Sequence, residues 1–253
     1  MTGSRRWRLV RARPEAVPAS VRRFNQRARE RRWRAAQPWL VGTAGLALAG
    51  LAGWVVYGTP VLGVRQVTVQ GTAILTPDEV RAAAAIRPGT PLASLDLGAV
   101  RRRVGALPPV RQATVTRAWP SMVRIVVVER VGFAAVRRPD GRYLVIDAAG
   151  VAFRTVPLPT GLPTLQLAAP DPADPTTRAA LAVLGALTEE LRDQLATLVA
   201  ESPARIRLEL RGGRQVIWGD ATENQTKAQA ATRLLSADGT VIDVSAPEFV
   251  TIR

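Results

Sequence analysis

Most of the side chains that carry enzyme chemistry are missing from this sequence. It contains no His and no Cys, and Lys227 is its single lysine. This composition excludes a Ser-His-Asp triad, a cysteine nucleophile and a zinc site with histidine ligands. A Ser-Lys dyad would need Lys227, which lies in a polar stretch with no nearby serine motif. No glycine-rich phosphate loop follows a predicted strand.

Carboxylates remain as groups that could act in catalysis. The sequence has 20 acidic residues, and subtracting Glu15 and Glu30 of the N-terminal segment leaves 18. A glycosidase needs a pair of carboxylates, but the acids here are scattered over predicted turns and helix starts, where such residues usually cap helices or bind water. We therefore predict that the protein is not an enzyme and has no catalytic residue, cofactor or metal ion.

The C-terminal stretch VIDVSAPEFVTIR predicts recognition chemistry instead. Val241–Ala246 alternates with the two-residue period of a strand. Pro247 has no backbone N–H and belongs at a sheet edge or a strand end. An edge strand offers unpaired N–H and C=O groups that a partner can extend. We predict that Val241–Ala246 is such an edge; the alternative is an internal strand paired on both sides.

One long apolar segment precedes the rest of the chain. There is no charged residue from Ala35 to Val64, and the most apolar part, Trp39–Gly58, has 20 residues. A helix of that length spans about 30 Å, the thickness of the hydrocarbon core. Aromatic rings at both ends suit the two membrane interfaces. We predict a transmembrane helix over residues 38–59, with these representative residues: Trp39, Leu46, Leu51, Trp54 and Tyr57.

The arginines predict the orientation of this helix. Residues 1–37 hold twelve Arg against Glu15 and Glu30, a net charge of +10 out of +15. Because positive charge stays on the cytoplasmic side, we predict a single-pass type II protein of the plasma membrane. A cleaved signal peptide is the alternative, but its small-residue pattern, Ala47-Leu48-Ala49, falls in the middle of the apolar run.

The basic segment 1–37 has two interpretations. It can be a disordered cytoplasmic tail that lies on anionic lipid headgroups. It can also bind nucleic acid or a cytoplasmic partner. Trp7 and Trp33 are too few and too far apart to form a base-stacking platform, so we favour lipid and predict no nucleic-acid partner.

Residues 62–131 predict a first folded unit with the order β-α-α-β-β. Val64–Gln70 alternates as a strand, and Thr76-Pro77-Asp78-Glu79 is typical of a helix start, for a helix over Pro77–Ile86. A second helix begins after Asp96. Two further strands, Val110–Arg117 and Met122–Val131, are joined by a short turn.

Residues 132–253 predict a second unit of short strands with flanking helices. Hairpins are expected from Phe133 to Asp147 and from Arg205 to Trp218, with a strand at Val151–Arg154. Helices are expected at Pro175–Leu187 and Asn224–Leu235. Periodicity leaves Leu191–Ala200 open as either helix or strand. The fold class is α+β, with a mixed, mostly antiparallel second sheet.

A basic tail, one span and an ordered series of motifs resemble the FtsQ/DivIB family of bacterial cell-division proteins. The motifs are VRQVTVQG, GTPLASLD, VRQATVTRAWPSMVRIVVVER, LVIDAAGVAF, GLPTL, KAQAATRLL and VIDVSAPEF. The resemblance implies that residues 62–131 form a POTRA (polypeptide-transport-associated) domain and residues 132–253 the family's β-domain. Gly132 departs from the family, whose members commonly carry proline there, and this loosens the expected joint between the domains.

The resemblance also implies a function and a site. Family members are scaffolds at the division septum that bind single-span FtsL and FtsB/DivIC-type proteins and so influence septal peptidoglycan synthesis. Their partner surface is the last helix and last strand of the β-domain, here Thr226–Leu235 and Thr240–Ile252. The implied contact residues are Lys227, Thr232, Val241, Ile242, Asp243, Val244, Ser245, Ala246 and Phe249.

Three other functions are compatible with parts of the sequence. POTRA domains also occur in outer-membrane translocation factors, but the second unit is too short and wrongly patterned for a membrane barrel. A wall-associated enzyme would cleave glycan or peptide. A membrane-anchored nucleic-acid binder would show steep salt dependence through residues 1–37.

Overall fold

The computed structural model describes residues 19–58, 62–246 and 248–253, with side chains described from residue 37 onward. Its helix α1 runs from Ala19 to Gly58 without interruption. The predicted disorder of the basic segment is therefore wrong for residues 19–36, while residues 1–18 lie outside the described residues. Arginine and alanine, which dominate this stretch, are good helix formers.

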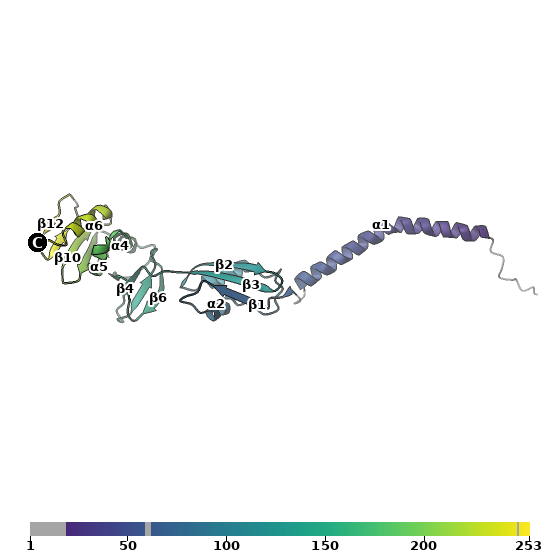
Figure 1. Ribbon diagram of the computed structural model, residues 1–253, viewed down its shortest axis with the longest axis horizontal. Coiled ribbons are helices and arrows are strands. Elements are labelled where there is room, and N and C mark those ends of the chain that lie inside the picture. The colour runs from purple at the N-terminus through teal and green to yellow at the C-terminus, as the bar shows by residue number, and fades with distance from the viewer. Residues whose placement is uncertain (1–18, 59–61, 247) are drawn as a thin grey trace, which may run out of the picture.

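Helix α1 contains one candidate membrane span, Gln37–Gly58, of 22 residues. Most of its side chains, including those of Trp39, Leu46 and Trp54, are exposed, as expected for residues that face lipid. Figure 1 shows α1 bending about halfway along its length, where Pro38 lies inside the helix. Proline removes a backbone donor and its ring displaces the preceding turn, which accounts for the bend. Residue 59, the predicted end of the span, lies outside the described residues.

The first unit has the predicted order of elements. These are β1 (Gln66–Gln70), α2 (Pro77–Ala84), α3 (Leu97–Gly105), β2 (Val110–Ala118) and β3 (Met122–Glu129). The strands form one sheet in the order β1-β3-β2, with β1 parallel and β2 antiparallel to β3. Thr76 and Glu79 form the reciprocal capping box of α2, and Asp96 caps α3 through the N–H of Ala99.

One face of this sheet is buried against the helices. Val123, Ile125 and Val127 of β3 alternate with Arg124, Val126 and Val128, and only the first three are buried. They share a core with Val80 of α2 and Val104 of α3. The strand period of two therefore gives the first unit a covered face and a wetter one, as predicted.

The second unit contains nine strands in one sheet. Its elements are β4 (Ala134–Arg137), β5 (Tyr143–Ile146), β6 (Ala152–Val156), β7 (Thr164–Gln166), α4 (Pro175–Ala186), α5 (Glu189–Gln194), β8 (Leu195–Ser202), β9 (Arg205–Leu210), β10 (Gln215–Gly219), α6 (Asn224–Arg233), β11 (Val241–Asp243) and β12 (Thr251–Ile252). The strand order is β12-β11-β10-β9-β8-β7-β4-β5-β6. Most neighbouring strands are antiparallel, while β7 is parallel to both β4 and β8 and β11 is parallel to β10.

Two elements of this sheet differ from the sequence-based expectations. The ambiguous stretch Leu191–Ala200 is both: its first residues end α5 and its remainder begins β8. The strand β7 was not predicted at all. Its three residues become a strand only because they lie between β4 and β8 and bond to both.

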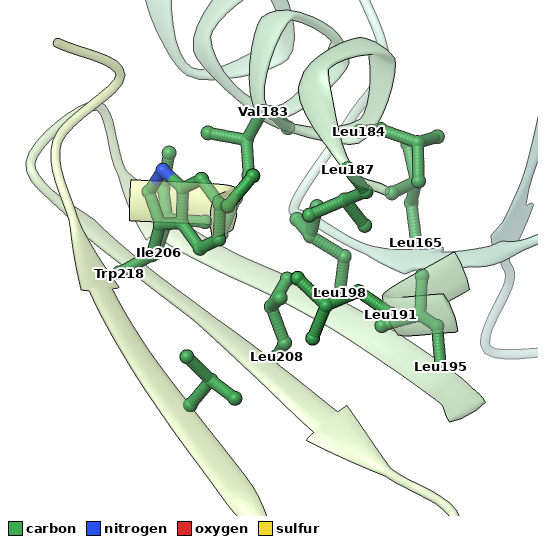
Figure 2. Packing of buried hydrophobic residues seen from close by; sticks show 14 of the residues in the cluster. Leu165, Val183, Leu184, Leu187, Leu191, Leu195, Leu198, Ile206, Leu208 and Trp218 are labelled. Atoms are coloured by element: carbon green, nitrogen blue, oxygen red, sulfur yellow. The ribbon is translucent and has the colours of Figure 1, made fainter. Parts of the chain in front are cut away.

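Helices α4, α5 and α6 bury the core of the second unit against the sheet. Figure 2 shows Val183 and Leu184 of α4, Leu187 directly after that helix, and Leu191 of α5, facing side chains that rise from the strands. The strand residues labelled in the figure are Leu165, Leu195, Leu198, Ile206, Leu208 and Trp218. Trp218 is fully buried, and its indole N–H donates to the Asn224 side chain at the start of α6 at 2.9 Å.

Specific contacts join the two units. The Arg130 guanidinium, just after β3, bonds to the Asp147 carboxylate of the second unit at 2.6 Å, and both side chains are mostly buried. The other oxygen of Asp147 accepts the N–H groups of Ala149 and Val151. At Gly132 an added Cβ would lie 2.9 Å from the Val145 side chain. The glycine expected to loosen this joint therefore lies in tight packing.

Candidate partner-binding surface

The last two strands determine which part of the sheet is open. Strand β11 pairs in parallel with β10 and antiparallel with β12, where Ile242 lies opposite Ile252. The prediction that Val241–Ala246 is an open edge is therefore wrong: β11 is paired on both sides, the arrangement set out as the alternative. A turn in which Phe249 N–H donates to Ala246 C=O brings the chain back along β11.

Strand β12 is the edge at this end of the sheet, since no strand of the described residues pairs with its outer side; β6 is the edge at the other end. Arg253 exchanges both of its backbone hydrogen bonds with Val241 at 3.0 Å, so its N–H and C=O point inward. Successive residues of a strand direct these groups to opposite sides. The N–H and C=O of Ile252 therefore point away from the sheet, where a partner backbone could bond to them.

Three of the predicted contact side chains face the core. Ile242 and Val244 are fully buried, and Lys227 is 1% exposed. Thr232 is half-buried and its hydroxyl bonds to the Thr188 hydroxyl and to a carbonyl of its own helix. Because the side chains of Lys227, Ile242 and Val244 are buried, the prediction that they contact a partner is wrong for these three.

Lys227 is buried with its charge satisfied. Its ammonium donates to the Asp220 carboxylate at 2.8 Å and to the Asp220 carbonyl at 3.1 Å. The hydrogen bond from Lys227, together with those from Thr222, lowers the pKa of Asp220 to about 2. The pair links the start of α6 to the end of β10, because Asp220 directly follows that strand.

The remaining predicted residues lie on the outside, around β12. Ser245, Ala246 and Phe249 are exposed, and Val241 and Asp243 are partly exposed. The Phe249 ring, 78% exposed, is the largest apolar group among them. We call this set the C-terminal edge surface: Ser245, Ala246, Phe249 and β12. Sequence reasoning missed β12 as the edge, although its apolar, β-branched residues are typical of a strand.

Two observations bear on the chemistry that the described residues could perform. Within residues 37–58, 62–246 and 248–253, no group of three or more acidic, His or Cys side chains could hold a metal. An open groove of about 880 Å³ lies elsewhere in the second unit and contains Arg192, Arg211 and a single carboxylate, Asp193. A lone carboxylate between two arginines does not make the paired acids of a glycosidase.

The fold defines a class of protein: one candidate membrane span, then a β-α-α-β-β domain, then a mixed sheet that ends in the exposed edge strand β12. Comparison of the sequence with known protein families agrees with this class. Residues 62–130 match the model of the FtsQ-type POTRA domain. Residues 134–248 match that of the C-terminal region of the cell division protein FtsQ/DivIB. The chain belongs to the FtsQ/DivIB family of cell-division proteins.

Individual relatives extend the likeness over most of the chain. The chain is 42% identical to the cell division protein FtsQ of Mycolicibacterium smegmatis, over 81% of this chain and 62% of the relative. It is 40% identical to FtsQ of Mycobacteroides abscessus, over 85% of this chain and 68% of the relative. It is 39% identical to FtsQ of Streptomyces bingchenggensis, over 82% of both chains. The chain thus spans less than two thirds of the length of the first of these relatives.

Proposed function

We propose that this protein is a non-enzymatic scaffold of the division complex, which holds other membrane-anchored division proteins at the septum. The partners are single-span proteins of the FtsL and FtsB/DivIC types, and through them the scaffold influences septal peptidoglycan synthesis. Its N-terminus is cytoplasmic and both folded units lie outside the membrane, as the arginine-rich start of α1 favours.

The observation that carries this proposal is the exposed strand edge beside an exposed aromatic ring. Strand β12 presents the backbone groups of Ile252 outward, and Phe249 stands next to it in the chain with most of its surface in solvent. Addition of a partner strand uses the first feature for affinity and the second for specificity. Buried aromatic anchors commonly supply much of the binding energy of an interface.

The experiment measures capture of FtsL and FtsB/DivIC-type proteins of the same organism by the full chain in detergent. Phe249→Ala should weaken capture at least about tenfold, because truncating an aromatic anchor costs about 1.4 kcal/mol or more. Leu158→Ala is the matched control: Leu158 lies in the same unit and is 70% exposed, but far from β12 along the sheet. Equal capture by wild type and Phe249→Ala would place the partner surface elsewhere.

A change at a buried position would not test this surface. Val244→Asp would place a carboxylate in the core, and lost binding would then report unfolding. Ser245→Arg is suitable, since Ser245 is exposed and precedes the turn to β12. Fluorescent tagging completes the test of location: a midcell band in dividing cells is expected, and a uniform membrane signal contradicts the septal role.

A further inference from the structure

The first unit begins very close to the membrane span. Helix α1 ends at Gly58, and by Leu62 the chain is already bonded into the unit, since the Leu62 carbonyl accepts the N–H of Leu92 at 3.0 Å. Four residues span at most about 14 Å when fully extended. One end of the unit is therefore held within that distance of the membrane surface.

The tip of the β2–β3 hairpin lies at this same end. The N–H groups of Arg65 and Gln66 both donate to the Ser121 carbonyl, at 2.8 and 3.3 Å. In the sheet, Gln66 lies beside Met122, the first residue of β3. Figure 1 shows the β2–β3 turn at the end of the unit nearest α1.

The hairpin tip presents an aromatic ring that the core of the unit does not use. Trp119 is 54% exposed, and Pro120 beside it is also exposed. The base of the tip is fixed, because the Arg117 guanidinium donates to the carbonyls of Leu92 and Leu95 at 2.7 and 2.8 Å. A tryptophan held rigidly near a bilayer is suited to the headgroup region, where its ring is buried and its N–H stays hydrated.

The charges around the tip favour an anionic surface. Arg65 and Arg87 are exposed at this end of the unit, and Arg117 lies at the base of the tip. The carboxylate of Asp96, at the start of α3, is engaged as the cap of that helix. Arginine near a bilayer attracts anionic headgroups.

We propose that the β2–β3 hairpin tip is a second membrane contact, in which Trp119 inserts into the headgroup region of the leaflet next to Gly58. The lipid surface is its partner, and the basic residues of this end support the contact. The first unit is thereby held against the membrane at two points, the span and the tip. Its sheet then keeps a fixed orientation relative to the membrane plane. The proposal does not depend on which proteins bind the C-terminal edge surface.

The test uses the full chain in nanodiscs of phosphatidylcholine and phosphatidylglycerol. The sequence has no cysteine, so Ser121→Cys provides a single site for a fluorescent label at the tip, with Trp119 intact. Nitroxide-bearing lipids then quench the label if the tip touches the bilayer. Ala106→Cys is the matched control. Ala106 is exposed and follows the C-terminal end of α3, at the end of the unit that lies away from the hairpin tip.

We expect quenching at Ser121→Cys and none at Ala106→Cys. Adding Trp119→Asp should abolish the quenching at the tip, whereas Trp119→Phe should keep it. Equal quenching at both positions overturns the proposal. Quenching that survives Trp119→Asp also overturns it, because the tip would then be near the bilayer only through the short linker. If Trp119→Asp does not fold, Trp119→Ser replaces it and is judged by the same two outcomes.

Discussion

Substitutions in the ion pair of Lys227 and Asp220 can show whether Lys227 acts in folding or in partner binding. The Lys227 side chain is 1% exposed and the Asp220 side chain is 48% exposed. The buried ammonium therefore needs its counter-charge, whereas water can solvate the carboxylate. Asp220→Asn leaves a buried ammonium without its counter-charge. Lys227→Met fills nearly the same volume, removes the buried charge, and leaves a carboxylate that water and Thr222 can still solvate.

The magnitudes follow from these exposures. Removing one partner of a fully buried pair costs about 3–5 kcal/mol, and exposed pairs contribute about 0–1 kcal/mol. This half-exposed pair lies between them, so Asp220→Asn should lower the free energy of unfolding by about 2 kcal/mol, given those limits. Lys227→Met should cost less than about 1 kcal/mol, because the desolvation of its ammonium is no longer required.

The pH dependence supplies an independent check. The pKa of Asp220 falls from 3.8 to about 2 on folding. A lowered pKa stabilises the fold above the unfolded value and loses that contribution as the pH falls from about 4 to about 2. The shift is equivalent to about 2.5 kcal/mol, which screening by water at this half-exposed carboxylate reduces to about 1–2 kcal/mol.

The assay is urea unfolding of the full chain in detergent, repeated from neutral pH to about pH 2, the folded pKa of Asp220. At neutral pH the midpoint of Asp220→Asn should fall by about 1 M, for a slope of about 2 kcal/mol per M. The difference from wild type should shrink in acid. A Lys227→Met midpoint as low as that of Asp220→Asn would refute the reasoning. So would loss of partner capture by a stable Lys227→Met protein, since a buried side chain cannot be a contact.

Three further perturbations test other parts of the structure. A double-mutant cycle of Arg130→Ala and Asp147→Ala should give a coupling of about 1–3 kcal/mol, because this pair between the two units is mostly buried; a value near zero would contradict its role in the joint. Burial raises the pKa of Glu129, but hydrogen bonds from the N–H groups of Leu75, Ile74 and Ala73 outweigh burial and hold this pKa below its ordinary value. Glu129→Gln should therefore destabilise the fold at neutral pH. The difference from wild type should disappear as the pH falls below about 4, the range in which an ordinary Glu titrates. Leu208→Ala, in the centre of the second core, should cost about 2–5 kcal/mol in urea unfolding.

Local sequence signals predicted the first unit well because its determinants are local. Thr76 and Glu79 cap α2 through each other, three residues apart, and Asp96 caps α3 through a residue equally near. The alternation of β3 decides its buried face without reference to the rest of the chain. In signals of this kind the interacting residues lie within a few positions of each other, so they can be recognised in the sequence alone.

The second unit was less predictable because its strands depend on distant partners. Strand β7 has three residues, too few to show a period, and exists because β4 and β8 lie on either side of it. The stretch Leu191–Ala200 holds the end of a helix and the start of a strand with no breaker between them. An apolar run of this kind fits either structure until its neighbours are in place.

The sequence by itself determined which catalytic side chains are absent and where the one candidate membrane span lies. The chain has no histidine or cysteine side chain to act in a site, and an uncharged run of about 20 residues is long enough for one span. Only the tertiary structure decided that β12 and not β11 is the edge, and that Lys227 is buried. The physical reason is that edges and burial are properties of pairing between distant segments: the alternation of Val241–Ala246 shows that it is a strand, but not which strands lie beside it.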